Sequence, residues 1–95
     1  MQPQVETVKK TKRALSLAQN IVRDIEAGAH SPGDRLPHED EMLARYEVAR
    51  ATLREALRFL ELQGVIHLQL GRGGGPVVAR PQTGDFANSL SLILH

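Results

Sequence analysis

Two arginines stand one helical turn apart in the segment RATLREALRFLEL, and their chemistry is the most specific that this 95-residue chain offers. A spacing of four residues places Arg50 and Arg54 on the same face of a helix. Each guanidinium is a permanently charged fork of N–H donors that fits the oxygens of a phosphate or the N7 and O6 acceptors of guanine. Arg72 follows in the run GRGGG, where no side-chain bulk prevents close approach of a backbone. These residue types indicate binding to a polyanion.

Other kinds of site find little support. The four histidines have no metal-ligand spacing and the chain has no cysteine, so we expect no metal site and no cofactor. GRGGG is not a nucleotide-binding loop, because it lacks the lysine and the helix of a Walker loop and Pro76 takes the last place of a G-x-G-x-x-G pattern. No serine or histidine lies in a nucleophile motif. The sequence therefore predicts a protein that is not an enzyme.

The length and net charge of the chain limit the kind of binding surface that it can form. A chain this short supports one hydrophobic core, and a net charge of +1 means that any polyanion must be bound by a local patch. The start MQPQVETVKK lacks the apolar stretch of a secretory signal, and no segment is apolar for long enough to cross a membrane. We expect a cytoplasmic protein, associated with the nucleoid if its ligand is DNA.

Three helices are predicted from apolar spacing. From Ala14 the apolar residues recur every three or four positions, and Gly28 ends this first helix. The turn SPGD and an edge bridge at DRL follow. The second helix is expected from about Glu39 to Tyr46, and the third from about residue 49 or 50 to Gln63. The third helix has a buried stripe of Leu53, Ala56, Leu57 and Leu60.

A glycine-tipped hairpin follows the helices. VIHLQL and PVVAR have the pattern of two strands joined across GRGGG. Two short helices with a tight break, followed by such a hairpin, predict a mainly α fold of three helices plus a two-stranded wing, the winged helix-turn-helix. The third helix would enter the major groove of DNA, and Arg72 on the wing would reach the adjoining minor groove or its phosphates.

Three segments are expected along the chain. Residues 1–10 are polar and aperiodic and predict a flexible N-terminal arm. Lys9, Lys10, Lys12 and Arg13 could approach a polyanion there, although a solvated tail is the simpler interpretation. Residues 11–80 form the DNA-binding domain. Residues 81–95 contain a linker and the start of an amphipathic helix with no partner, so the chain is expected to be a fragment that lacks an effector domain.

The segment LPHEDEMLARYEVARATLREALRFLELQGVIHLQLGRGGGPVV resembles the DNA-binding domain of GntR-type bacterial transcription regulators, and in particular the FadR-like branch. The pieces LP, TLREAL, LELQGVI and the glycine-rich tip stand at compatible spacings. The resemblance implies DNA contacts by a set of residues on the third helix and the wing. They are Ala49, Arg50, Ala51, Thr52, Arg54, Leu70 and Gly71, to which Arg72 and Gly73 are added as neighbours in the wing.

Four positions depart from the family pattern. Asp40 stands where the family has an arginine that touches DNA, so we expect altered base preference. Glu47 replaces a glycine in the turn, and backbone strain follows if that position has positive φ. Ala49 replaces a serine or threonine, which removes a helix cap and a phosphate-binding hydroxyl. His38 replaces the serine that caps the second helix.

The resemblance also implies partners. It predicts a homodimer on a short palindromic operator, and a metabolite-responsive repressor once the effector domain is present. The alternative is a winged-helix protein-interaction module without specific DNA binding, with Phe59 and the helix of residues 85–94 as its docking surface. Glu55, next to Arg54 in the sequence, is expected to form a structural ion pair within the domain and not to contact bases.

Overall fold

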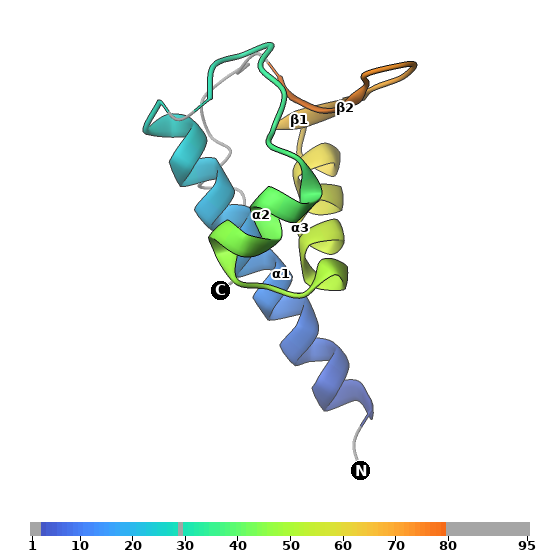
Figure 1. The fold of residues 1–95 in the computed structure, drawn as a ribbon. Helices are drawn as coiled ribbons and strands as arrows, with labels where there is room; N and C mark the ends of the chain where they lie inside the picture. Colours follow the sequence, from blue (N-terminus) through green and yellow to red (C-terminus); the bar gives the residue numbers. More distant parts are fainter. Residues whose placement is uncertain (1–2, 29, 80–95) are drawn as a thin grey trace.

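The computed structural model describes residues 3–28 and 30–79 as three helices followed by a two-stranded antiparallel sheet (Figure 1). The helices are α1 (Pro3–Glu26), α2 (Glu39–Tyr46) and α3 (Arg50–Leu62), and the strands are β1 (Ile66–Gln69) and β2 (Gly75–Val78). The predicted fold of three helices with a β-hairpin wing is confirmed. The expected linker and helix of residues 81–95 lie outside the described residues.

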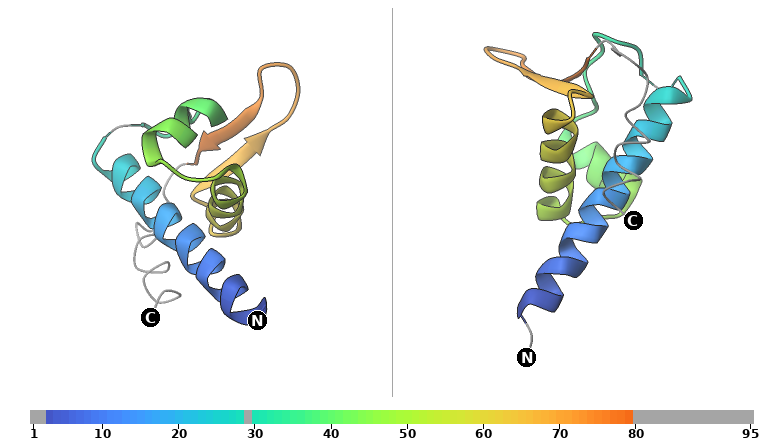
Figure 2. Two further views of the ribbon diagram at one scale, coloured as in Figure 1. Left: turned by 60° about the horizontal axis from the view of Figure 1, so that its bottom comes forward. Right: turned by 180° about the vertical axis from the view of Figure 1, so that it is seen from behind.

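α1 begins at Pro3, although apolar spacing predicted its start only at Ala14, so residues 3–10 of the expected N-terminal arm are helical. The first turns of α1 project beyond α2 and α3 (Figure 2). Residues 7–10 in this part of the helix are exposed, so they form no apolar stripe, while Lys9 and Lys10 still favour the helical backbone. Apolar periodicity therefore marks where α1 meets the core and not where it starts.

The core lies between α1 and α3. These two helices make the most extensive contact in the fold, and α2 packs across them. The largest fully buried side chains come from α1, α3 and β1, and each stabilises the fold by roughly 1.5 to 3 kcal/mol relative to full exposure. They are Ile21, Val22, Leu53, Leu60 and Ile66.

A hydrogen bond fixes α2 to α1. The Tyr46 hydroxyl, at the end of α2, donates to Oδ2 of Asp24 on α1 at 2.5 Å. Burial, followed by this carboxylate, raises the pKa of Tyr46 to about 12. The bond sets the position of the turn that leads from α2 into α3.

The wing contains more than its two strands. β1 and β2 pair from Ile66 with Val78 to Gln69 with Gly75. The loop segment of residues 33–36 then lies along the other edge of β2, and the predicted bridge at DRL is confirmed as a pairing of Arg35 with Val77. Two backbone bonds of 2.8 Å join Gly33 N to Val78 O and Val78 N to Asp34 O, and Leu36 N donates to Pro76 O at 3.0 Å. The α1–α2 loop thereby holds the hairpin from one side.

Candidate nucleic-acid interface

α3 has one buried and one exposed face, as its sequence predicts. Leu53, Ala56 and Leu60 are fully buried against the core. The opposite face is exposed and forms a shallow depression. This outer face consists of Arg50, Ala51, Arg54, Glu55 and Arg58. Because the apolar side of α3 packs against the core, its arginines point toward solvent.

One carboxylate on α2 holds both predicted arginines. Nε of Arg54 donates to Oε1 of Glu39 at 2.9 Å, and Nη1 of Arg50 bonds Oε2 of the same side chain. Nη2 of Arg50 also lies 3.5 Å from Oδ1 of Asp40. The arginine side chains stay 49% and 67% exposed for Arg50 and Arg54 respectively. The two guanidinium groups are thus fixed side by side and remain accessible.

The sequence did not identify Glu39 as part of this site. It was predicted only as the first residue of the second helix, and the ion pair expected within the domain was at Glu55. Among the described residues no ion pair forms at Glu55. Hydrogen bonding from Arg54, together with the charge of Arg50, lowers the pKa of Glu39. Its carboxylate is ionised at neutral pH, and exposed ion pairs of this kind exchange readily with solvent or ligand.

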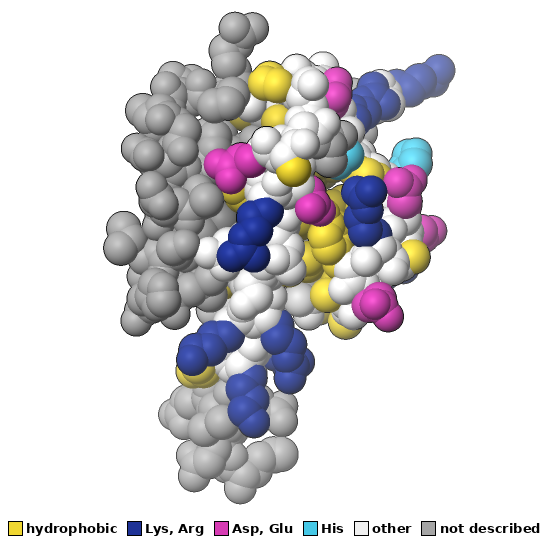
Figure 3. Space-filling view, turned by 90° about the vertical axis from the view of Figure 1, so that its left-hand side faces the viewer, with side chains coloured by type: hydrophobic (Ala, Val, Ile, Leu, Met, Phe, Trp, Pro, Cys, Tyr) yellow, Lys and Arg dark blue, Asp and Glu magenta, His cyan; other side chains and the backbone are white. Residues whose placement is uncertain are grey.

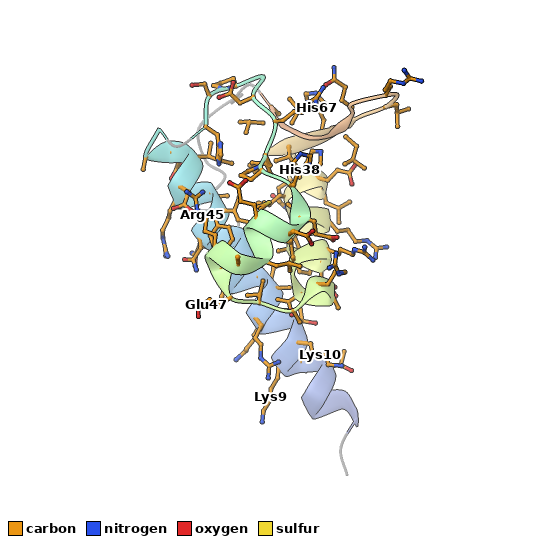
Figure 4. All side chains as sticks on the ribbon, viewed as in Figure 1. Lys9, Lys10, His38, Arg45, Glu47 and His67 are labelled. Carbon is orange, nitrogen blue, oxygen red and sulfur yellow. The ribbon has the colours of Figure 1, made fainter. Side chains whose placement is uncertain are left out.

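The departures from the family pattern have visible structural effects. Glu47 ends α2 with φ 53° and ψ 51°, so a non-glycine residue occupies the left-handed conformation that was suspected there. Its side chain points away from the wing (Figure 4). His38 and Ala49 stand at the starts of α2 and α3, and neither caps its helix with a side chain. The early N–H groups of α3 are left free of a side-chain cap.

The start of α3 borders a groove that α1 completes. Ala49 is exposed and Thr52 is half-buried, and both line this groove of about 520 Å³. Lys12 and Arg13 of α1 line its other wall. Figure 3 shows basic side chains gathered on the projecting part of α1. The fold thus brings cations from the supposed arm close to the start of the recognition helix.

The wing places its predicted residues in solvent. Leu70, Gly71, Arg72 and Gly73 form the exposed tip of the hairpin, and Leu70 is 90% exposed. Gly74 has a specific need for glycine, because a Cβ there would overlap the carbonyl oxygen of Gln69. The tip lies at the end of α3 opposite Arg50 (Figure 1), so the recognition helix and the wing occupy separate places along the candidate interface.

Other kinds of site are not seen in the described part of the chain. Within residues 3–28 and 30–79, no cluster of three potential ligands could hold a metal ion. His38 begins α2 and His67 lies on β1 (Figure 4). None of the helices in the same residues combines the length and apolar character needed to cross a bilayer. Phe59, suggested above for protein docking, packs against the core, and residues 85–94 lie outside the described residues.

Known proteins with similar sequences are regulators. The putative HTH-type transcriptional regulator RmpR of Mycobacterium gastri is 39% identical over 72 residues, which cover 75% of this chain and 26% of RmpR. The Uxu operon regulator of Haemophilus influenzae is 35% identical over 57 residues, which cover 60% of this chain and 21% of that regulator. The chain therefore spans about a quarter of the length of these relatives.

Solved structures with the same fold include regulators and a DNA complex. The possible transcriptional regulator YydK from Bacillus subtilis aligns with a TM-score of 0.63 and 28% identity, over 78% of this chain and 32% of YydK. AraR(DBD), in a crystal structure with operator ORR3, aligns with a TM-score of 0.59 and 31% identity, over 70% of this chain and 78% of that chain. Residues 13–75 match the model described as bacterial regulatory proteins, gntR family, and the chain belongs to that family.

Proposed function

We propose that this chain is the DNA-binding domain of a transcription regulator and recognises operator DNA by sequence. The observation that carries the proposal is the pair of exposed guanidinium groups that Glu39 holds together on the outer face of α3. An α-helix fits the major groove of B-DNA, and guanine presents there the two acceptors that an arginine fork matches. The likeness to AraR(DBD), which was crystallised with operator ORR3, supports this role.

The proposed contacts divide the interface into helix and wing. Arg50 and Arg54 pair with bases in the major groove, while Thr52 and the free N–H groups at the start of α3 meet phosphates, with Ala49 and Ala51 in close approach. Leu70, Gly71, Arg72 and Gly73 bring the wing to the neighbouring minor groove. The separation of these two groups along the molecule supports contact with two successive grooves.

Asp40 supports a base preference that differs from that of the family. Its side chain is 90% exposed and lies beside Arg50, where the family pattern has an arginine that touches DNA. A carboxylate repels phosphate, but in the major groove it accepts a hydrogen bond from the amino group of cytosine. The proposed outcome is an operator with a changed sequence around the position nearest Asp40.

The whole regulator remains a matter of proposal. We propose a homodimer on a short palindrome, with residues 11–80 as the DNA-binding domain and residues 81–95 leading to a separate effector domain that binds a small molecule. Names among the relatives include a probable fructoselysine utilization operon transcriptional repressor of Escherichia coli, which supports repression as the mode of action. The FadR-like branch rests only on the sequence resemblance of LP, TLREAL, LELQGVI and the glycine-rich tip, and a cytoplasmic location follows from the proposed DNA ligand.

Replacement of Arg54 tests the proposed base contact. Arg54→Ala should weaken binding to the preferred sequence by roughly 1 to 3 kcal/mol and relax discrimination at one base position, because a bidentate pair with guanine is lost. Competitive binding with a set of singly mutated duplexes measures this change. Arg45→Ala is the matched control, since Arg45 lies on the other side of the molecule from the wing (Figure 4). A loss that is equal on all sequences would instead make Arg54 a phosphate contact.

A further inference from the structure

Arg35, which no sequence motif identified, lies against the wing. It belongs to the loop segment that pairs with β2, and its own backbone position is opposite Val77. Hydrogen bonds on both sides of it, from Gly33 to Val78 and from Leu36 to Pro76, fix this register. Arg35 is therefore held at the base of the hairpin, although it lies 38 positions before Gly73 in the sequence.

The guanidinium of Arg35 rests on the bare face of Gly73. A Cβ on that glycine would lie 3.2 Å from Nη2 and 3.5 Å from Nη1 of Arg35. Gly73 also has φ +74°, so its backbone favours glycine independently of this contact. Because Gly73 has no side chain, the guanidinium of Arg35 can lie against its backbone, beside the turn that contains Arg72.

The charge at this end of the interface is uncompensated. Arg50 and Arg54 share Glu39 and Asp40, whereas no carboxylate in residues 3–28 and 30–79 forms an ion pair with Arg35 or Arg72. Asp34, the acid nearest to Arg35 in sequence, accepts a hydrogen bond from the amide of Ser31 at 2.9 Å. Both arginines are exposed. This end of the interface thus presents two cations without an ion pair among the described residues, whereas Arg50 and Arg54 of α3 are paired with carboxylates of α2.

We propose that Arg35 binds a DNA phosphate at the border of the groove that the wing enters. This inference rests on the proposed function and adds a contact from the α1–α2 loop. The guanidinium lies against Gly73 in the exposed tip of the hairpin, beside the turn that carries Arg72, so a phosphate at the edge of the groove that the wing enters lies within its reach. A phosphate accepts two parallel hydrogen bonds from a guanidinium, and an arginine without a competing carboxylate is available to form them.

The test compares Arg35→Gln, Arg35→Lys and the control Arg45→Gln in the 95-residue chain. Binding to random-sequence duplexes and to the preferred duplex is measured over a range of salt concentrations. Loss of one phosphate contact lowers the slope of log K against log salt by about 0.9, so between 50 and 200 mM salt the wild type should lose roughly threefold more affinity than Arg35→Gln. Arg35→Lys should keep most of the slope, and Arg45→Gln all of it.

Three results would overturn the inference. A wild-type slope in Arg35→Gln would mean that Arg35 only supports the hairpin. A loss confined to particular sequences would make it a base contact. If the wild type binds and Arg54→Ala weakens binding while Arg35→Gln does not, only the Arg35 contact fails, whereas a wild-type chain that binds no duplex removes the proposed function as well.

Gly73→Ala supplies an independent check. The added methyl group would lie 3.2 Å from Nη2 of Arg35, so the guanidinium must shift by a few tenths of an ångström, and the loss of affinity should be larger in the wild type than in Arg35→Gln. The backbone strain at residue 73 is common to both backgrounds and cancels in the comparison. Equal losses in the two backgrounds would show that Arg35 does not act through this contact.

Discussion

Glu39 is the residue on which the recognition surface is organised. It holds Arg50 and Arg54 in one arrangement, yet it is also a negative charge that any DNA must approach. Its partners are 11 and 15 positions away in the sequence, so helical spacing gave no sign of the contact. Arg35 escaped notice for the same reason. Contacts between elements depend on how helices and loops pack, which residue types and local periodicity do not specify.

Neutralising Glu39 should raise the affinity for random-sequence DNA and lower the selectivity for the preferred sequence. In Glu39→Gln, Arg54 loses its ion pair, Arg50 keeps only the longer one to Asp40, and one negative charge is removed, so binding to random-sequence duplexes should become tighter. The ratio of preferred to random-sequence affinity should fall, because the guanidinium groups are no longer held in one arrangement. Glu26→Gln, at the far end of α1, makes the same charge change as a control. An unchanged ratio in Glu39→Gln would rule out a positioning role.

The left-handed turn at Glu47 offers a stability test. A non-glycine residue in this conformation is strained, so Glu47→Gly should raise the free energy of unfolding by roughly 0.5 to 1 kcal/mol, after allowance for the greater freedom of glycine in the unfolded chain. Urea denaturation measures the change. Glu47→Ala removes the same carboxylate but keeps the strain, and it should bring no such gain; equal stabilisation by both variants would assign the effect to charge.

The elements were predictable to different degrees. α2 and α3 follow their apolar spacing closely, and the glycine run marks the hairpin tip because Gly71, Gly73 and Gly75 all have positive φ there. The start of α1 was missed because residues 7–10 are exposed and show no apolar stripe. The third segment of the sheet was foreseen only as a bridge, since its register depends on backbone bonds to β2 that no local pattern reveals.

The link between α1 and α2 should give alkaline instability. The pKa of Tyr46 is raised from 10.0 to about 12, chiefly by burial and then by Asp24. The folded protein therefore keeps this proton where the unfolded chain has lost it, so stability is complete below pH 10 and falls as the pH rises toward 12. Unfolding by urea at a series of pH values measures the effect. Tyr46→Phe should lose this component, and an identical alkaline profile in the variant would exclude Tyr46 as its source.

At the scale of the molecule, the described residues form one helix that faces the proposed DNA site and one wing. A palindromic operator contains two half-sites, and a single chain can occupy only one of them. The chain acting alone is therefore expected to bind weakly and with steep salt dependence. Sedimentation in parallel with binding assays tests this expectation on operator-like duplexes. Nanomolar binding by a strict monomer would contradict it, and would remove the main reason for proposing a dimer.

The edge pairing of residues 33–36 bears on how the hairpin meets a ligand. A hairpin of two four-residue strands has only marginal stability in water by itself. Here a further segment is hydrogen-bonded to its outer edge, and the amide of Val65 donates to the carbonyl of Leu60 where the hairpin begins. The tip therefore belongs to a hairpin that is hydrogen-bonded along one edge and at its start. Binding to a partner then does not require a flexible hairpin to become ordered, so less conformational entropy is lost on binding.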